Sequence, residues 1–134
     1  MKAKSPIILA LDFPDIDSTK QMIHQTEDSI SIYKLGLEFF LRFGSEGVKE
    51  IQRLTAKKIF LDLKLHDIPN TVGAAAAQVA SLNTKFLTVH ASGGAEMINA
   101  AVLNAPNTEI TAVTILTSLS QNDMDEIGFE GTPQ

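Results

Sequence analysis

The sequence predicts a single globular domain of the α/β class whose strands form a parallel sheet, from the order of its segments, its length and its composition. Short runs of large apolar residues alternate strictly with segments of helical spacing along the chain. Such alternation is typical of a parallel sheet with right-handed crossovers. The length of 134 residues fits one domain, and 44% hydrophobic with 20% charged residues is typical of globular proteins. We therefore predict a single domain over residues 1–134.

Five strands are expected from the apolar runs, each of which is short and rich in large apolar residues. The third run begins with Lys58-Ile-Phe-Leu and is followed by the Pro-Asn pair of a loop. In chain order, the predicted strands are residues 6–13, 30–36, 58–64, 86–91 and 110–118.

The helices between the first three strands have clear start or break signals. Asp15 or Asp17 is expected to cap the first helix, which continues to about residue 26. The second helix has apolar residues at positions 48, 51 and 54, at helical spacing, and it is expected to break at Gly44 and Gly47.

The remaining helices follow the third, fourth and fifth strands. Pro69 or Thr71 begins the first of these, and four consecutive alanines favour its continuation to residue 82. The next helix is expected over residues 95–105. Ser120 opens a last helical turn, which is expected over residues 123–127.

Composition argues against several classes of function. The net charge is −5, and no cluster of Lys and Arg with interleaved aromatic residues is visible, which disfavours nucleic acid binding. The chain has no cysteine, so it has no disulfide framework and no thiolate metal site. The apolar run at residues 7–11 is too short for a signal peptide, and no segment is long enough to span a membrane. We expect a cytoplasmic protein.

Polar residues gather where the predicted strands end, and this pattern predicts the architecture of the sheet. Functional groups at the carboxyl ends of successive strands are typical of a TIM (β/α)8 barrel, whereas an open doubly wound sheet concentrates them at one switch point. A whole barrel needs about 250 residues. We therefore expect the first five βα units of a barrel, an incomplete one. The polar residues at the strand ends are Asp12, Lys34, Asp62, Lys64, Asp67, His90, Ser92, Thr117 and Ser118.

Asp62 and Lys64 form the most informative part of this pattern. Side chains two apart on a strand share a face, so this carboxylate and ammonium are expected to point the same way. Buried charges are costly unless they are paired and hydrogen-bonded. A structural ion pair could explain both residues, but it explains less well why Asp67 follows at the junction of strand and loop, where α/β proteins place their chemistry.

The residues around this pair resemble those of a known family. The segment Asp62-Leu-Lys-Leu-His-Asp-Ile-Pro-Asn-Thr71, with Leu11-Asp12 and Tyr33-Lys-Leu-Gly36 on earlier strands, closely resembles orotidine 5′-phosphate decarboxylases of the bacterial type. Residues 89–94 and 113–118 extend the resemblance along nearly the whole chain. The resemblance implies a TIM-barrel homodimer without cofactor or metal that removes CO2 from orotidine 5′-phosphate to give UMP. It also implies that the chain matches about the amino-terminal five-eighths of such a barrel.

The resemblance implies catalytic roles for four residues. Lys34, Asp62, Lys64 and Asp67 match the family's Lys-Asp-Lys-Asp array. Lys64 matches the proton donor to C6 of the pyrimidine. Asp62 is expected to face the substrate carboxylate, and carboxylates on both sides of Lys64 are expected to hold it charged and positioned.

Further residues match substrate-binding positions of the family. Asp12 and Lys34 match the positions that hold the ribose hydroxyls. Asp67, Ile68 and Thr71 match residues that family dimers insert into the site of the neighbouring subunit. Thr117 or Ser118 lies where a hydroxyl meets the pyrimidine ring.

Two other functions remain open from the sequence. Sugar-phosphate decarboxylases of the same superfamily share the Asp-x-Lys-x-x-Asp pattern, but they require Mg2+ held in part by a Glu at the position of Lys34, whose charge would repel the ion. The chain could also be an inactive half-barrel that acts only by association with another chain. The family's phosphate-binding loops follow strands seven and eight, whereas this chain matches only the first five βα units. His66 and His90 are not at metal-ligand spacing, and Ser92-Gly-Gly94 is expected to be a tight turn into a helix.

Overall fold

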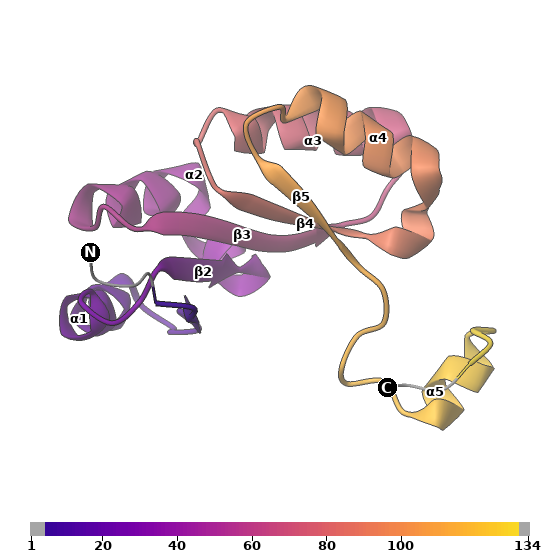
Figure 1. Cartoon of the computed structure of the whole chain (residues 1–134), viewed down its shortest axis with the longest axis horizontal. Helices are drawn as coiled ribbons and strands as arrows, with labels where there is room; N and C mark the ends of the chain where they lie inside the picture. The colour runs from indigo at the N-terminus through magenta and orange to yellow at the C-terminus, as the bar shows by residue number, and fades with distance from the viewer. Residues whose placement is uncertain (1–4, 132–134) are drawn as a thin grey trace.

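The computed structural model describes residues 5–131 and contains five strands that alternate with helices (Figure 1). The strands are β1 (Ile8–Ala10), β2 (Ile32–Gly36), β3 (Lys58–Leu65), β4 (Phe86–His90) and β5 (Glu109–Val113). The helices are α1 (Ile16–Thr26), α2 (Leu37–Leu54), α3 (Pro69–Ala80), α4 (Gly94–Asn104) and α5 (Gln121–Glu126), with a short 3-10 turn η1 (Ala91–Gly93) before α4.

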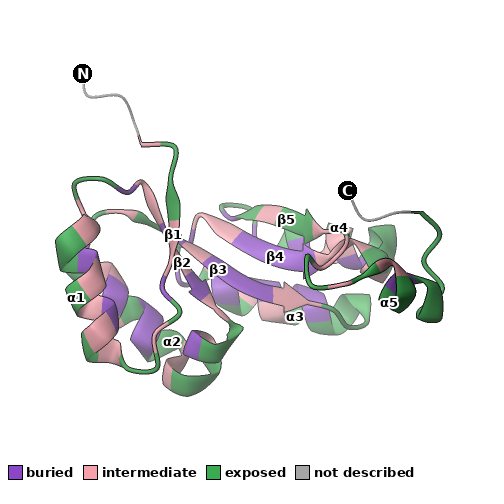
Figure 2. Cartoon of the chain, turned by 90° about the horizontal axis from the view of Figure 1, so that it is seen from below, coloured by how far each residue is buried: buried purple, intermediate pink, exposed green. Residues whose placement is uncertain are grey.

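The five strands form one parallel sheet in the order β1-β2-β3-β4-β5, which confirms the predicted sheet. The core includes alternate residues of the strands, and Figure 2 shows that β3 and β4 contain buried stretches. Half-buried Phe60 and Phe86 stack edge to face with ring centres 5.5 Å apart, and neither belongs to that buried core. The buried core residues of β2, β3 and β4 are Tyr33, Leu35, Ile59, Leu61, Leu63, Leu87 and Val89.

Local sequence signals explain where several helices begin and bend. The Asp15 carboxylate accepts a hydrogen bond from the Ser18 N–H at 2.7 Å and caps α1, as predicted. Pro69 occupies the first turn of α3, where its missing N–H costs no helical hydrogen bond. Helix α2 bends at Gly44, whose φ of 60° and ψ of −160° are not helical. The predicted break at Gly47 is wrong: this residue is helical and buried, and an added Cβ would stand 2.3 Å from the Phe43 Cβ.

The two outermost strands are shorter than the sequence predicts. Strand β1 ends at Ala10, although the Leu11 N–H still donates to the Lys34 carbonyl at 2.9 Å. Strand β5 was expected to reach residue 118 but ends at Val113. Its partner β4 ends in register with it, His90 opposite Val113, and then enters the η1 turn, so β5 has no backbone to pair with beyond that point.

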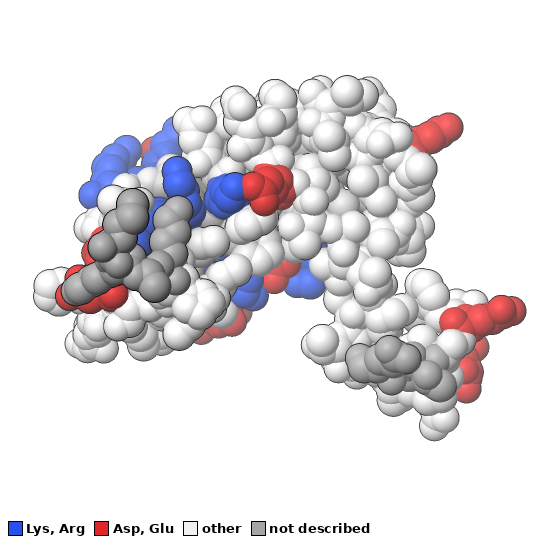
Figure 3. Space-filling model, viewed as in Figure 1, with Lys and Arg blue, Asp and Glu red and all other residues white. Residues whose placement is uncertain are grey.

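Charged residues are unevenly distributed over the surface. Between residues 69 and 108, Lys85 and Glu96 are the only charged side chains, and the space-filling view shows little charge over α3 and α4 (Figure 3). We call the exposed residues of these two helices, apart from Glu96 at the start of α4, the uncharged surface. Leu103 at its end is 79% exposed. Within residues 5–131, no helix combines the length and the apolar character that crossing a bilayer requires.

Candidate active site

Asp62 lies at the centre of a cluster of polar side chains from three adjacent strands. It is buried on β3, and its two carboxylate oxygens accept three hydrogen bonds. Lys34 Nζ on β2 lies 3.0 Å from Oδ2, Lys64 Nζ lies 2.8 Å from Oδ1, and the Thr88 hydroxyl on β4 lies 2.9 Å from Oδ1. We call Lys34, Asp62, Lys64 and Thr88 the Asp62 cluster.

An irregularity in β3 gives the cluster its geometry. Leu61 pairs with Leu87 and Leu65 pairs with Val89, so four steps along β3 match two along β4. Lys64 lies in this bulge with a φ of 51°, the left-handed region that residues with a Cβ rarely adopt. Asp62 and Lys64 therefore share a side of the strand, as expected, but through a bulge and not through regular alternation.

The electrostatics of the cluster keep Asp62 ionised. Burial alone would raise the pKa of the Asp62 carboxyl. The hydrogen bonds from the two lysines and from Thr88 outweigh that effect and hold the pKa below its ordinary value of 3.8. With two ammonium groups against one carboxylate, the cluster retains net positive charge. The side chains of Lys34 and Lys64 are 26% and 36% exposed, so both ammonium groups can reach a bound molecule.

Asp12 lies at the same end of the sheet. It follows β1 and is exposed, and its Oδ1 lies 3.4 Å from the place where a Cβ of Gly36 would stand. Gly36 pairs in register with Asp62. The structure therefore brings Asp12, which follows β1, to the same edge of the sheet as Lys34 on β2 and Asp62 and Lys64 on β3.

The structure does not bring Asp67, Ile68 or Thr71 into this cluster. All three are exposed, and Asp67 Oδ1 accepts the N–H of Ile68 at 2.7 Å. Asp67 and Ile68 line a shallow depression with His66, Ser92 and Gly93. Within residues 5–131, Asp62 is the one carboxylate paired with Lys64, and Asp67 makes no ion pair with that ammonium.

Thr117 and Ser118 were expected on the fifth strand, and this placement is wrong. Both are exposed in a turn after β5, outside the Asp62 cluster. The predicted tight turn at Ser92-Gly-Gly94 is confirmed, because η1 leads directly into α4 there. In the described part of the chain, no group of three or more His, Cys, Asp or Glu is placed to hold a metal ion.

Thr88 was missed by the sequence analysis. It is 3% exposed and is the one hydroxyl residue inside the apolar strand Phe86–His90. Its position in the sequence could have indicated a role in the site. Alternation along the strand places Thr88 on the same face as His90, and the buried Leu87 and Val89 on the other face.

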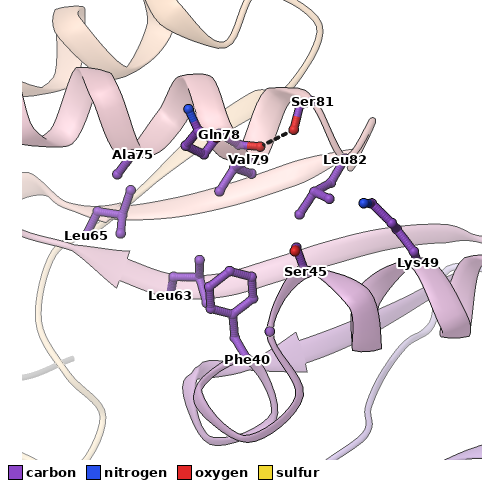
Figure 4. A pocket seen from close by; sticks show the side chains of 11 residues that line it. Phe40, Ser45, Lys49, Leu63, Leu65, Ala75, Gln78, Val79, Ser81 and Leu82 are labelled. Atoms are coloured by element: carbon purple, nitrogen blue, oxygen red, sulfur yellow. Dashed lines mark hydrogen bonds between the residues drawn. The ribbon is translucent and has the colours of Figure 1, made fainter.

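A cavity of about 580 Å3 lies elsewhere, between α2 and α3 (Figure 4). Phe40, Leu63, Leu65, Val79 and Leu82 give it a largely apolar wall. Neither Asp62 nor Lys64 lines it, so this cavity is separate from the Asp62 cluster.

Comparisons with known proteins identify the family. Residues 5–134 match the model of the "Orotidine 5'-phosphate decarboxylase / HUMPS family". An orotidine 5'-phosphate decarboxylase of Thermobifida fusca is 46% identical over 127 residues, which cover 95% of this chain and 54% of the relative.

Solved structures agree in fold. The orotidine 5'-phosphate decarboxylase of Lactobacillus acidophilus matches with a TM-score of 0.83 and 33% identity, covering 96% of this chain and 62% of that one. The orotidine 5'-monophosphate decarboxylase of Methanocaldococcus jannaschii, complexed with the inhibitor BMP, matches with a TM-score of 0.75 and 27% identity. The match covers 81% of this chain and 51% of that one.

The chain thus spans little more than half the length of the curated relatives it matches. Its five parallel strands and their helices are five βα units of the TIM-barrel fold, an incomplete barrel. The chain belongs to the orotidine 5'-phosphate decarboxylase / HUMPS family.

Proposed function

We propose that the Asp62 cluster is part of the active site of an orotidine 5′-phosphate decarboxylase, which converts orotidine 5′-phosphate to UMP and CO2. The observation that carries this proposal is the pair of ammonium groups held against one buried carboxylate at the carboxyl ends of β2 and β3. In a parallel α/β fold this is the end where substrates bind.

The chemistry of the reaction fits this arrangement. When the bond between C6 and the substrate carboxylate breaks, the electron pair stays on C6 and CO2 leaves. The ring has no position that delocalises this charge, so a fixed cation beside C6 is the most useful catalyst. An ammonium at 4 Å stabilises the charge by about 4 kcal/mol at an effective dielectric of 20.

Lys64 is the proposed source of the proton that C6 then takes up. The proton moves from its Nζ to C6, and the resulting amine regains a proton from water. Asp62 holds Lys64 Nζ at 2.8 Å, which fixes the donor in place before substrate binds. The proposed mechanism uses side chains alone, without metal or cofactor.

The remaining roles concern substrate binding. We propose that Asp12 and Lys34 hold the ribose hydroxyls, that Asp62 faces the substrate carboxylate, and that Thr117 or Ser118 contacts the pyrimidine ring. The exposed position of Asp12 beside Gly36 supports its role, because it leaves the carboxylate free to accept hydrogen bonds.

A second copy of the chain is the proposed partner. Asp67, Ile68 and Thr71 would reach into the site of that copy, where Asp67 would supply the second carboxylate beside Lys64. Ile68 is 65% exposed, and the adjacent uncharged surface lacks the charges that would oppose burial in a dimer. Cytoplasmic location is part of the same proposal.

Lys64→Ala tests the proposal that Lys64 donates the proton to C6. Decarboxylation is measured from the ultraviolet absorbance of orotidine 5′-phosphate, both for the chain alone and for a chimera that joins it to the carboxyl-terminal segment of the Thermobifida fusca relative. We expect activity to be abolished in Lys64→Ala and retained in Lys49→Ala, which changes a surface lysine paired with Glu46. A folded Lys64→Ala chimera with kcat within about tenfold of the parent chimera would remove Lys64 from the mechanism.

A further inference from the structure

The Thr88 hydroxyl contacts two other members of the Asp62 cluster, the carboxylate of Asp62 and the backbone of Lys64. Its oxygen lies 2.9 Å from Asp62 Oδ1 and 2.9 Å from the backbone nitrogen of Lys64. A hydroxyl has one proton to donate and can accept through its oxygen. Because the Lys64 N–H can only donate, the Thr88 hydroxyl accepts there and must direct its own proton at Asp62. Both contacts fix its orientation.

The backbone of Lys64 needs such a partner. Between Leu61 and Leu65 the pairing of β3 with β4 is interrupted, and the Lys64 N–H is bound by a side chain where a regular strand would offer a carbonyl. The left-handed φ of Lys64 is a strained conformation that persists only where surrounding contacts hold it. Thr88 supplies one such contact from the neighbouring strand.

We infer that Thr88 is a positioning residue, whose hydroxyl holds the Asp62 carboxylate and the Lys64 backbone in one fixed arrangement. Among the described residues its hydroxyl makes no hydrogen bond to either ammonium group, and it acts on Lys64 through the backbone and through Asp62. The structural part of this inference stands on the contacts alone. Its catalytic consequence, that Thr88 keeps the Lys64 ammonium at the reacting carbon, rests on the proposed decarboxylase function.

Three variants separate the hydroxyl from the bulk of the side chain. Thr88→Val keeps the shape and removes the hydroxyl, and Thr88→Ser keeps the hydroxyl. Thr111→Val is the matched control, because Thr111 pairs with Thr88 on β5 and is exposed outside the Asp62 cluster.

Two measurements by NMR need no activity. The Asp62 carboxyl is titrated through its carbon signal, and we expect its pKa to rise in Thr88→Val, because the ionised form loses a donor, and to stay at the parent value in the other two variants. Hydrogen exchange of the Lys64 amide is expected to accelerate in Thr88→Val alone, because that N–H loses its acceptor. An unchanged Asp62 pKa and unchanged exchange in a folded Thr88→Val would overturn the inference.

One test uses the parent chain alone and so does not depend on whether a variant folds. A Thr88 hydroxyl held between two partners exchanges its proton with water slowly, whereas the exposed hydroxyl of Thr111 exchanges fast. We expect a separate proton signal for Thr88 and none for Thr111. Equal, fast exchange of both hydroxyl protons would contradict the inference.

The last measurement is the rate of decarboxylation, made with the chain alone or with the chimera, whichever is active in the Lys64→Ala experiment. We expect Thr88→Val to lower kcat by about tenfold, the effect of one lost hydrogen bond to a charged group, with little change in KM. Thr88→Ser should restore kcat. Normal kcat in Thr88→Val would contradict the catalytic consequence. An inactive parent would instead count against the proposed function and leave the NMR tests of Thr88 in force.

Discussion

Replacing Asp62 by Asn should destabilise the protein in a pH-dependent way. The variant keeps the shape of the side chain and leaves the Lys34 and Lys64 ammonium groups without a counter-charge at 3.0 and 2.8 Å. Removing one partner of a fully buried ion pair costs about 3–5 kcal/mol, whereas exposed pairs contribute about 0.2–1 kcal/mol. Because both lysine side chains are partly exposed and can regain water, we expect an intermediate loss of about 2 kcal/mol.

The sign of the pH dependence follows from the lowered pKa of Asp62. A carboxyl whose pKa is lower in the folded state than its ordinary 3.8 contributes stability that is fully present above pH 3.8. That contribution is lost as the pH falls through the folded-state pKa. The difference between parent and Asp62→Asn should therefore be constant from pH 7 to about pH 5 and shrink below pH 3.8.

Urea unfolding followed by circular dichroism measures this difference at each pH. Thermal melting at pH 7 should show a midpoint about 6–10 °C lower in the variant, since 1 kcal/mol shifts the midpoint by about 3–5 °C at this chain length. Glu46→Gln is the control, because that carboxylate is 74% exposed and water screens its pair with Lys49, so the variant should unfold like the parent. Equal stability of parent and Asp62→Asn at pH 7, or a difference that does not change down to pH 3, would refute the reasoning.

Three further predictions concern other parts of the molecule. EDTA should leave decarboxylation unchanged, and activity that depends on added Mg2+ would favour the sugar-phosphate branch of the superfamily instead. An inactive Asp67→Asn subunit mixed with an inactive Lys64→Ala subunit should regain activity, because heterodimers contain one pocket with both native residues. Failure to regain activity despite verified subunit exchange would show that each site is built within one chain. Thr84→Val should raise the free energy of unfolding in urea by up to about 1 kcal/mol, because the buried Thr84 hydroxyl oxygen has no hydrogen-bond partner among the described residues. A loss of stability in Thr84→Val would show that this hydroxyl is satisfied.

Local patterns predicted the features that depend on local physics. The alternation of apolar runs with helical segments predicted the parallel sheet, and the break of α2 at Gly44 was expected from the residue type. Gly47 shows the limit of that signal, because a glycine can also serve close packing, here against Phe43.

Features that depend on a neighbouring strand were not predictable from one segment alone. The end of β5 is set by where β4 stops pairing, and β4 turns away at Ala91. The left-handed backbone of Lys64 likewise needs the hydroxyl of Thr88, which lies 24 residues further along the chain. Asp62 and Lys64 were correctly expected to share a side of β3. A regular strand and the observed bulge both place these two side chains on the same side of the strand.

The bulge in β3 has a consequence for tolerance to insertions and deletions. It adds two residues relative to β4, so Leu65 returns to the same face of the sheet as Leu61, which lies in the core, and packs against that core. Removing Leu63 and Lys64 together would keep both flanking halves of the strand in phase, whereas removing one residue would turn Leu65 away from the helices. A change of two residues in this segment therefore leaves the pairing of β3 with β4 in phase, but a change that removes Lys64 also removes the proposed proton donor.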